Sequence, residues 1–153
     1  RDVAVTGVQT CALPISRPVV ITRFAEVYLI GAEAYLQAGD KAKAAELLNV
    51  LRQRAAYRKT NTPAQNTAAA AAMLIKDSDV TIDFILDERS RELFGEWMRY
   101  QDLVRTKSLV RRIKLWNNEA APYVKDFHVL RPIPQSEIDR TVDGPPFTQN
   151  AGY

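Results

Sequence analysis

The sequence is poor in the two residue types on which many protein sites depend, because it has a single cysteine, Cys11, and a single histidine, His128. One thiol excludes an internal disulfide framework and any multi-cysteine metal site. One imidazole argues against a histidine-based zinc site and against a Ser-His-Asp triad. His128 is predicted to be half-buried in an extended segment, and we expect neither a metal nor another cofactor.

Long apolar runs are also missing. No run approaches the roughly 20 residues that span a bilayer, and no positively charged leader with an apolar middle precedes a cleavage site.

An excess of charge of one sign is absent too, since 21 basic residues face 18 acidic ones for a net charge of +3. Nucleic-acid binding would require basic side chains gathered beside aromatics on one face. The nearest candidate is the segment KSLVRRIKLW, residues 107–116. A basic amphipathic helix and an ordinary solvated helix face both fit it, and the second interpretation is favoured. We therefore expect no nucleic-acid partner.

What the sequence does contain is helical periodicity. The chain has 153 residues, 46% of them hydrophobic, which suits one domain with a real core. A helical hairpin is predicted over residues 22–56, with Thr22 capping the first helix, Gly39 ending it and Asp40 capping the second. Residues 57–77 are predicted to form a variable, mobile loop that runs through an alanine stretch into short turns.

A long helix is predicted over residues 81–105, capped by Thr81. Its apolar stripe includes Leu86, Leu93 and Trp97, and Gly95 within it indicates that another helix passes close by. The helix also carries a ladder of charged side chains at three- and four-residue steps. The members of this ladder are Glu88, Arg89, Glu92, Glu96, Arg99, Asp102 and Arg105.

The ladder is predicted to be structural. Arg89 falls on the buried stripe and must be paired there, and we expect arginines to lie against both Glu92 and Glu96. A catalytic role is disfavoured, because glycoside hydrolases place two carboxylates on opposite sides of a substrate, which neighbours on one helix cannot do. Nearby arginines would also keep such carboxylates ionised. We expect no enzyme activity.

Three strings in the second half of the chain resemble the C-terminal signature of the SusD/RagB family. They are LDERSRELFGEWMRYQDLVR at residues 86–105, RPIP at residues 131–134, and the terminal QNAGY, where Ala151 replaces the family's usual proline. The hairpin in turn resembles a tetratricopeptide unit, through small and aromatic residues at matching spacings. These are Tyr28, Ala32, Tyr35, Gly39, Ala44 and Leu48.

The resemblance implies an all-α fold with a tetratricopeptide-like hairpin, a long helix and an irregular, extended C-terminal segment over residues 122–153. It covers residues 17–153. Residues 1–16 resemble nothing in the family and are predicted to be non-native or disordered. Cys11 lacks the apolar leader of a lipidation site, so the chain is interpreted as a C-terminal fragment. One hairpin cannot bury its own apolar face, so the first helix should expose apolar side chains.

The function implied is non-catalytic binding of a polysaccharide, an oligosaccharide or another nutrient at the outer membrane. A SusC-like TonB-dependent transporter is the implied partner, and the implied membrane contact is a lipid anchor outside this fragment. Trp116 and Tyr123 are the candidate ligand-binding residues, although Trp116 is equally suited to closing its helix onto the core. The alternative function is a tetratricopeptide-type scaffold that binds a peptide in its groove.

Overall fold

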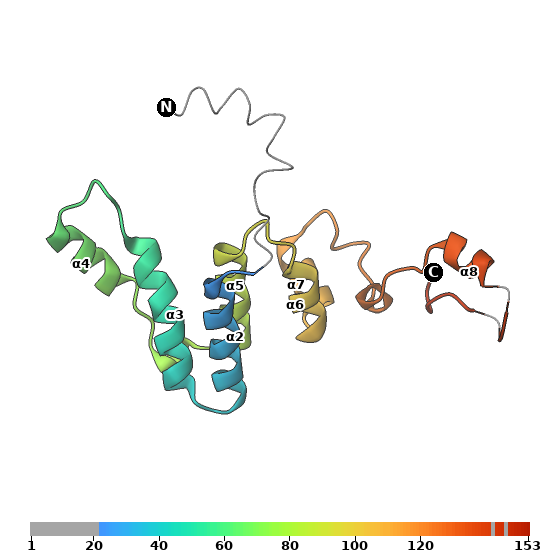
Figure 1. Cartoon of the computed structure of the whole chain (residues 1–153), viewed down its shortest axis with the longest axis horizontal. Coiled ribbons are helices and arrows are strands. Elements are labelled where there is room, and N and C mark those ends of the chain that lie inside the picture. Colours follow the sequence, from blue (N-terminus) through green and yellow to red (C-terminus); the bar gives the residue numbers. More distant parts are fainter. Residues whose placement is uncertain (1–21, 142, 146) are drawn as a thin grey trace, which may run out of the picture. The chain divides into compact units, whose positions relative to one another are not determined.

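The computed structural model describes residues 22–141, 143–145 and 147–153 (Figure 1). These residues form α-helices, short 3-10 turns and irregular segments, with no strand among them, so the predicted all-α class is confirmed. The chain divides into two compact units at Glu96. The prediction for residues 1–16 lies outside the described residues.

The first unit begins with a helical hairpin made of α2 (Phe24–Gln37) and α3 (Lys41–Ala56). Gly39 lies in the turn between them at φ +85°, a left-handed conformation that glycine adopts without steric cost. Asp40 caps α3 by accepting a hydrogen bond from the backbone N–H of Lys43 at 3.0 Å. Thr22 does not cap α2: the cap position belongs to Arg23, whose side chain makes no capping bond.

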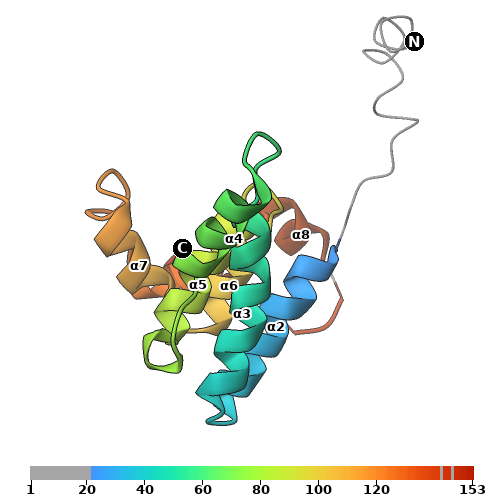
Figure 2. The ribbon, with the colours of Figure 1, turned by 90° about the vertical axis from the view of Figure 1, so that its left-hand side faces the viewer.

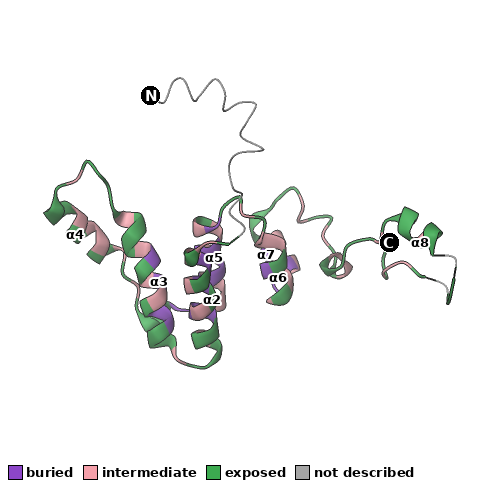
Figure 3. Ribbon diagram, viewed as in Figure 1, coloured by how far each residue is buried: buried purple, intermediate pink, exposed green. Residues whose placement is uncertain are grey.

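Helix α5 (Ile82–Glu92) packs against this hairpin, and Figure 2 shows the arrangement from a second direction. Thr81 caps it, as predicted, by accepting a hydrogen bond from the N–H of Phe84 at 3.1 Å. The buried side chains lie where the three helices face one another (Figure 3). Leu29, Leu48 and Ile85 are fully buried, and burial of each such side chain contributes about 1.5 to 3 kcal/mol.

The outer face of α2 exposes apolar side chains. Phe24, Val27 and Ile30 have about half or more of their surface accessible, at 70%, 49% and 52%. Those three side chains are spaced three residues apart, so they share one face of the helix. The expectation that the first helix shows apolar surface is met at these positions.

The segment predicted to be a mobile loop contains a helix, α4 (Pro63–Ala72), followed by the 3-10 turn η1 (Asp77–Asp79). The N-terminus of α4 has a capping box, in which Thr62 and Gln65 bond each other's backbone N–H groups, and Pro63 occupies the first turn. The alanine run, which has high helix propensity, then extends the helix, and α4 contacts α3 although none of its residues is fully buried. The prediction of an irregular loop for these residues is therefore wrong.

The long helix predicted over residues 81–105 is interrupted, which corrects that prediction as well. Helix α5 ends at Glu92, and six residues separate it from α6 (Arg99–Arg105). Gly95 adopts φ +82° and Trp97 φ +66°, both incompatible with a right-handed helix. A Cβ built on Gly95 would meet no atom within 4 Å. Gly95 therefore allows a turn, and does not make room for a passing helix.

The break also changes the apolar stripe of this region. Trp97, predicted to be a stripe residue, is 92% exposed, and Phe94 beside it is 90% exposed. Leu86 and Leu93 are buried as predicted.

The second unit contains α6, α7 (Leu109–Trp116), the 3-10 turn η2 (Asp126–Val129) and α8 (Gln135–Arg140). Its C-terminal tail is docked onto the segment around the RPIP string. The side-chain amide of Gln149 donates to the carbonyl of Ile133 at 2.8 Å, and its oxygen accepts from the N–H of Ile133 at 2.7 Å. The hydroxyl of Tyr153 donates to the carbonyl of Leu130 at 2.7 Å.

These contacts join the RPIP string to the terminal QNAGY string. Asn150 adds a bond from its side-chain amide to the carbonyl of Arg131 at 2.7 Å, and the ring of Tyr153 meets that of Phe127 edge-on at 5.0 Å between centroids. The tail therefore has a defined path despite its irregular sequence. In the part of the chain that the structure describes, no helix is long and apolar enough to cross a membrane.

Replacing Gly95 by alanine tests the break between α5 and α6. A left-handed backbone at this residue predicts that Gly95→Ala lowers the free energy of unfolding by about 1 to 2 kcal/mol. A continuous helix predicts the opposite, a gain of about 1 kcal/mol. Urea denaturation of the chain measures the sign, with Gly39→Ala, at the hairpin turn, as the reference for a left-handed glycine. If Gly95→Ala stabilised the chain while Gly39→Ala destabilised it, the observed turn at Gly95 would be ruled out.

Candidate functional site

Charged side chains of the first unit gather where α5 meets the start of α2 and the end of α3. Arg23 donates from Nε to Glu96 Oε1 at 2.7 Å and from Nη1 to Glu92 Oε1 at 2.6 Å. It also donates to the backbone carbonyl of Glu92. Arg54, on α3, donates from Nη2 to both carboxylate oxygens of Glu92, at 2.6 and 2.7 Å. Arginines thus lie against both Glu92 and Glu96.

The hydrogen bond to Glu92 is the main reason that the pKa of Arg23 is raised above its ordinary value, and the bond to Glu96 and the charges of both carboxylates add to it. The guanidinium therefore stays charged, and it holds the start of α2 against the C-terminal end of α5.

A second group of charges surrounds Glu88, one turn earlier on α5. Its Oε1 accepts from Arg91 at 2.6 Å and also from Arg52 of α3. The Nε of Arg52 donates to the backbone carbonyl of Met73 at 2.7 Å. Arg52 thereby ties α3 both to α5 and to the segment that follows α4.

Arg89 and Glu26 form a buried ion pair between α5 and α2. The Nη2 of Arg89 lies 3.6 Å from Glu26 Oε1, and the two residues are only 3% and 6% exposed. Burying a charge is unfavourable unless another charge or hydrogen bonds compensate it. The pair accordingly requires α2 and α5 to keep one relative position.

In the second unit, Asp102 and Arg105 form a pair one turn apart on α6, with Arg105 Nη2 at 2.9 Å from Asp102 Oδ1. Asp102 is buried, whereas Arg105 is exposed and Arg99 is half-buried. The seven residues of the predicted ladder are therefore divided between two units and do not form one continuous seam. Its members in the first unit are Glu88, Arg89, Glu92 and Glu96.

The two candidate aromatic residues lie on the surface of the second unit. Trp116 ends α7 and is 76% exposed, and Tyr123 is 75% exposed. Trp116 therefore does not close its helix onto the core. Both rings are accessible to a ligand from solvent.

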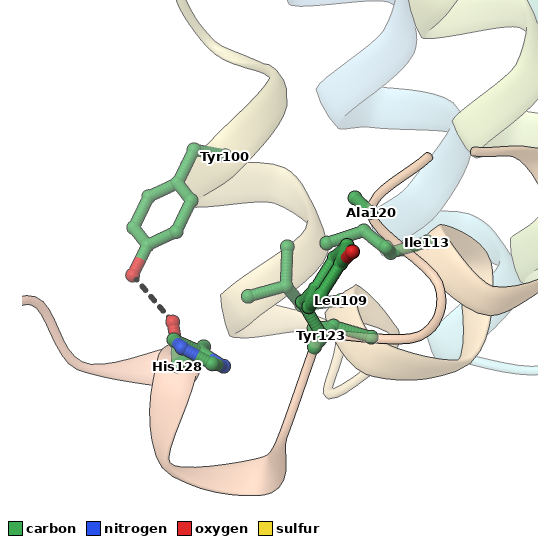
Figure 4. Close-up of a pocket in the computed structure, with 7 residues that line it drawn as sticks. Tyr100, Leu109, Ile113, Ala120, Tyr123 and His128 are labelled. Atoms are coloured by element: carbon green, nitrogen blue, oxygen red, sulfur yellow. Dashed lines mark hydrogen bonds between the residues drawn. The ribbon is translucent and has the colours of Figure 1, made fainter. Parts of the chain in front are cut away.

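Tyr123 lines a pocket of about 310 Å³ in the second unit (Figure 4). Its wall is mainly apolar, with Leu109 and Ile113 from α7, while Tyr100 of α6 and His128 of η2 add polar atoms. The hydroxyl of Tyr100 donates to the backbone carbonyls of His128 and Val129, at 3.2 and 3.0 Å. Trp116 is not among the lining residues.

Sequence reasoning missed Tyr100 as part of this pocket, because its spacing placed it on an apolar helix stripe. The guanidinium of Arg131, from the RPIP string, stacks over the Tyr100 ring at 4.6 Å. Together with the docked tail, this contact brings residues of all three signature strings into one unit. Arg23 was missed as the partner of Glu92 and Glu96 because it precedes the helix and is 69 and 73 residues away from them in the chain.

The three glutamates of the ladder are all ion-paired. Glu88, Glu92 and Glu96 are each held by at least one arginine. Among the described residues, no cluster of three or more histidine, cysteine, aspartate or glutamate side chains could hold a metal ion.

The tetratricopeptide-like hairpin, the ion-paired α5 and the docked tail define an all-α protein whose signature residues make ion pairs and hydrogen bonds within each unit. Residues 14–153 match the model of the SusD family, and the chain belongs to that family. It is also similar to SusD-like protein P38 of Formosa agariphila, with 37% identity over 93 residues. That alignment covers 60% of this chain and 18% of the relative's length. No solved structure matches the chain.

Removing the guanidinium of Arg89 is expected to destabilise the first unit strongly. Arg89→Ala leaves the buried carboxylate of Glu26 without this partner, and loss of one member of a buried pair typically costs about 3 to 5 kcal/mol. The free energy of unfolding, measured by urea denaturation, checks this value. Arg140→Ala is the matched control, since Arg140 is exposed and pairs one turn away with Glu137, and it should change stability by less than about 1 kcal/mol. Equal stability of the two variants would contradict the buried pair.

Proposed function

We propose that this chain is part of a non-catalytic glycan- or nutrient-binding component of an outer-membrane uptake system. The component holds its ligand at the cell surface and acts with a SusC-type TonB-dependent transporter. Membership of the SusD family supports this function, because the family consists of outer-membrane binding proteins that are generally not enzymes. A lipid anchor outside this chain would hold the component at the membrane.

The observation that carries a binding role for this part of the protein is the exposure of two aromatic rings, Trp116 and Tyr123, on the second unit. Aromatic rings offer a large, rigid apolar face, which can stack on the apolar face of a sugar ring. We assign both residues to ligand contact.

The environment of Tyr123 supplies the polar groups that a sugar would need. The pocket beside it is within the size range of small-ligand sites, and it combines apolar walls with the Tyr100 hydroxyl and the His128 ring. Neighbouring Asn117 and Asn118 are exposed and carry amides that can bond hydroxyl groups. This composition favours a neutral polyhydroxylated ligand at this site.

Mutation of Trp116 separates ligand contact from a packing role. Trp116→Ala in the intact protein should weaken binding of its preferred polysaccharide by about tenfold, or about 1.4 kcal/mol, with an unchanged melting temperature. Isothermal titration calorimetry against a panel of polysaccharides, together with thermal denaturation, measures both quantities. Tyr123→Ala should behave in the same way.

Trp97→Ala is the control for this experiment, because Trp97 is also a highly exposed tryptophan but has no asparagines beside it, whereas Trp116 is followed by the exposed Asn117 and Asn118. It should leave affinity unchanged. An equal loss of affinity in the Trp97 and Trp116 variants would contradict the assignment of Trp116 to the binding site. A lower melting temperature and a broader transition for Trp116→Ala would show that this side chain contributes to packing.

The proposed partner and location can be tested with the intact gene product. Fractionation of the native cells should place it in the outer membrane, and mild detergent should extract it together with a TonB-dependent transporter. Treatment of whole cells with protease should digest it. Recovery in the cytoplasm with a peptide-binding partner would instead favour the tetratricopeptide scaffold.

A further inference from the structure

A second pocket, in the first unit, lies between α3 and α5 and has a volume of about 410 Å³. Leu51, Met73 and Phe84 give it apolar walls. The charged residues of its lining are Arg52, Arg91, Glu88 and Glu92. Its size is that of a site for a small molecule. Neither the ladder prediction nor the aromatic site of the second unit uses this pocket.

The two arginines of the pocket are held close to each other by the same two partners. Both donate to one carboxylate oxygen, Oε1 of Glu88. Both guanidinium groups also lie over the ring of Phe84, at 5.6 Å for Arg52 and 6.0 Å for Arg91. The negative face of an aromatic ring attracts cations, so Phe84 and Glu88 together offset the repulsion between the arginines.

Most N–H groups of these arginines are not used by the described residues. Arg52 donates through Nε to Met73 and through Nη1 to Glu88, and Arg91 donates through Nη2 to Glu88. A guanidinium has five N–H donors and no acceptor. Nη2 of Arg52 and Nε and Nη1 of Arg91 therefore remain for an acceptor that enters the pocket.

The surrounding charges leave a positive surplus. The ion-paired cluster at the pocket contains two arginines, Arg52 and Arg91, and one glutamate, Glu88. Glu92, which also lines the pocket, is paired in a separate group with Arg23 and Arg54. One positive charge is therefore not balanced within the cluster. A ligand with a single negative charge would balance it, and one with two negative charges would exceed it.

We propose that the pocket between α3 and α5 binds a singly charged oxyanion, a carboxylate or a sulfate ester, attached to a body the size of one sugar ring. Arg52 and Arg91 donate to the oxyanion through the groups named above, in the geometry that guanidinium and planar or tetrahedral oxyanions share. Leu51, Met73 and Phe84 contact the apolar face of the ring. The site belongs to the first unit, so it is independent of Trp116 and Tyr123.

Titration of the full chain with three small probes tests the charge and its source. The probes are glucuronate, glucose 6-sulfate and neutral glucose, followed by isothermal titration calorimetry at low salt. The two anions should bind at least about tenfold more tightly than glucose, because charge-assisted hydrogen bonds are the stronger ones. Binding of glucuronate alone identifies a carboxylate ligand, and binding of glucose 6-sulfate alone identifies a sulfate ester. Equal affinity for all three probes, or no binding of either anion, would overturn the proposal.

Arg91→Gln is the variant that locates the site, because Arg91 is largely exposed and Arg52 continues to hold Glu88 without it. It should weaken anion binding at least about tenfold at an unchanged melting temperature. Phe84→Leu should weaken binding of the ring-bearing anions and leave that of acetate unchanged.

Arg140→Gln removes an exposed arginine of the second unit and should leave anion binding unchanged. Trp116→Ala should leave it unchanged as well, which separates this pocket from the proposed glycan site. Equal losses in the Arg91 and Arg140 variants would show that the anions bind by net charge alone, and the pocket would then have no special role.

Discussion

The buried ion pair between Arg89 and Glu26 is the interaction on which the first unit depends most. Apolar packing between helices tolerates small shifts, because one methyl group can replace another against the same neighbour. A buried guanidinium and a buried carboxylate have no such alternative, since each would lose its compensation if either helix moved along its axis. The pair therefore selects one alignment of α2 and α5 from the several that leucine and alanine contacts would allow.

Arg23, Arg52 and Arg54 extend the same constraint to the edges of the three-helix unit. Each comes from the hairpin and ends on a glutamate of α5, or on the glutamate just beyond it. The residues that carry the family resemblance on this helix are thus the acceptors for arginines that the hairpin supplies. Such an arrangement explains why the signature contains so many charged residues in a segment whose apolar side chains already face a core. These ion pairs constrain how α5 lies against the hairpin.

Interactions within a few residues were predictable from the sequence, and interactions between distant segments were not. Asp40 and Thr81 cap their helices as expected, because each cap involves only four successive residues. The burial of Arg89 followed from helical spacing.

The break at Gly95 was missed because the hydrophobic pattern on either side continues in phase. A glycine in such a pattern fits a close helix contact and a turn equally well. Helix α4 was missed because its start depends on the capping box of Thr62 and Gln65, which the polar composition concealed. Likewise, Tyr123 was found as an exposed aromatic, but its pocket needed Tyr100 and His128 from other segments.

The attachment of the C-terminal tail has a chemical consequence of its own. One glutamine side chain, Gln149, occupies both the N–H and the carbonyl of Ile133, and so replaces a pair of main-chain bonds with a single amide group. Spontaneous deamidation would turn that amide into a carboxylate, which can accept from the N–H but can no longer donate to the carbonyl. Ageing of the protein in storage would therefore release the last residues first, and an increase of one negative charge would accompany that release.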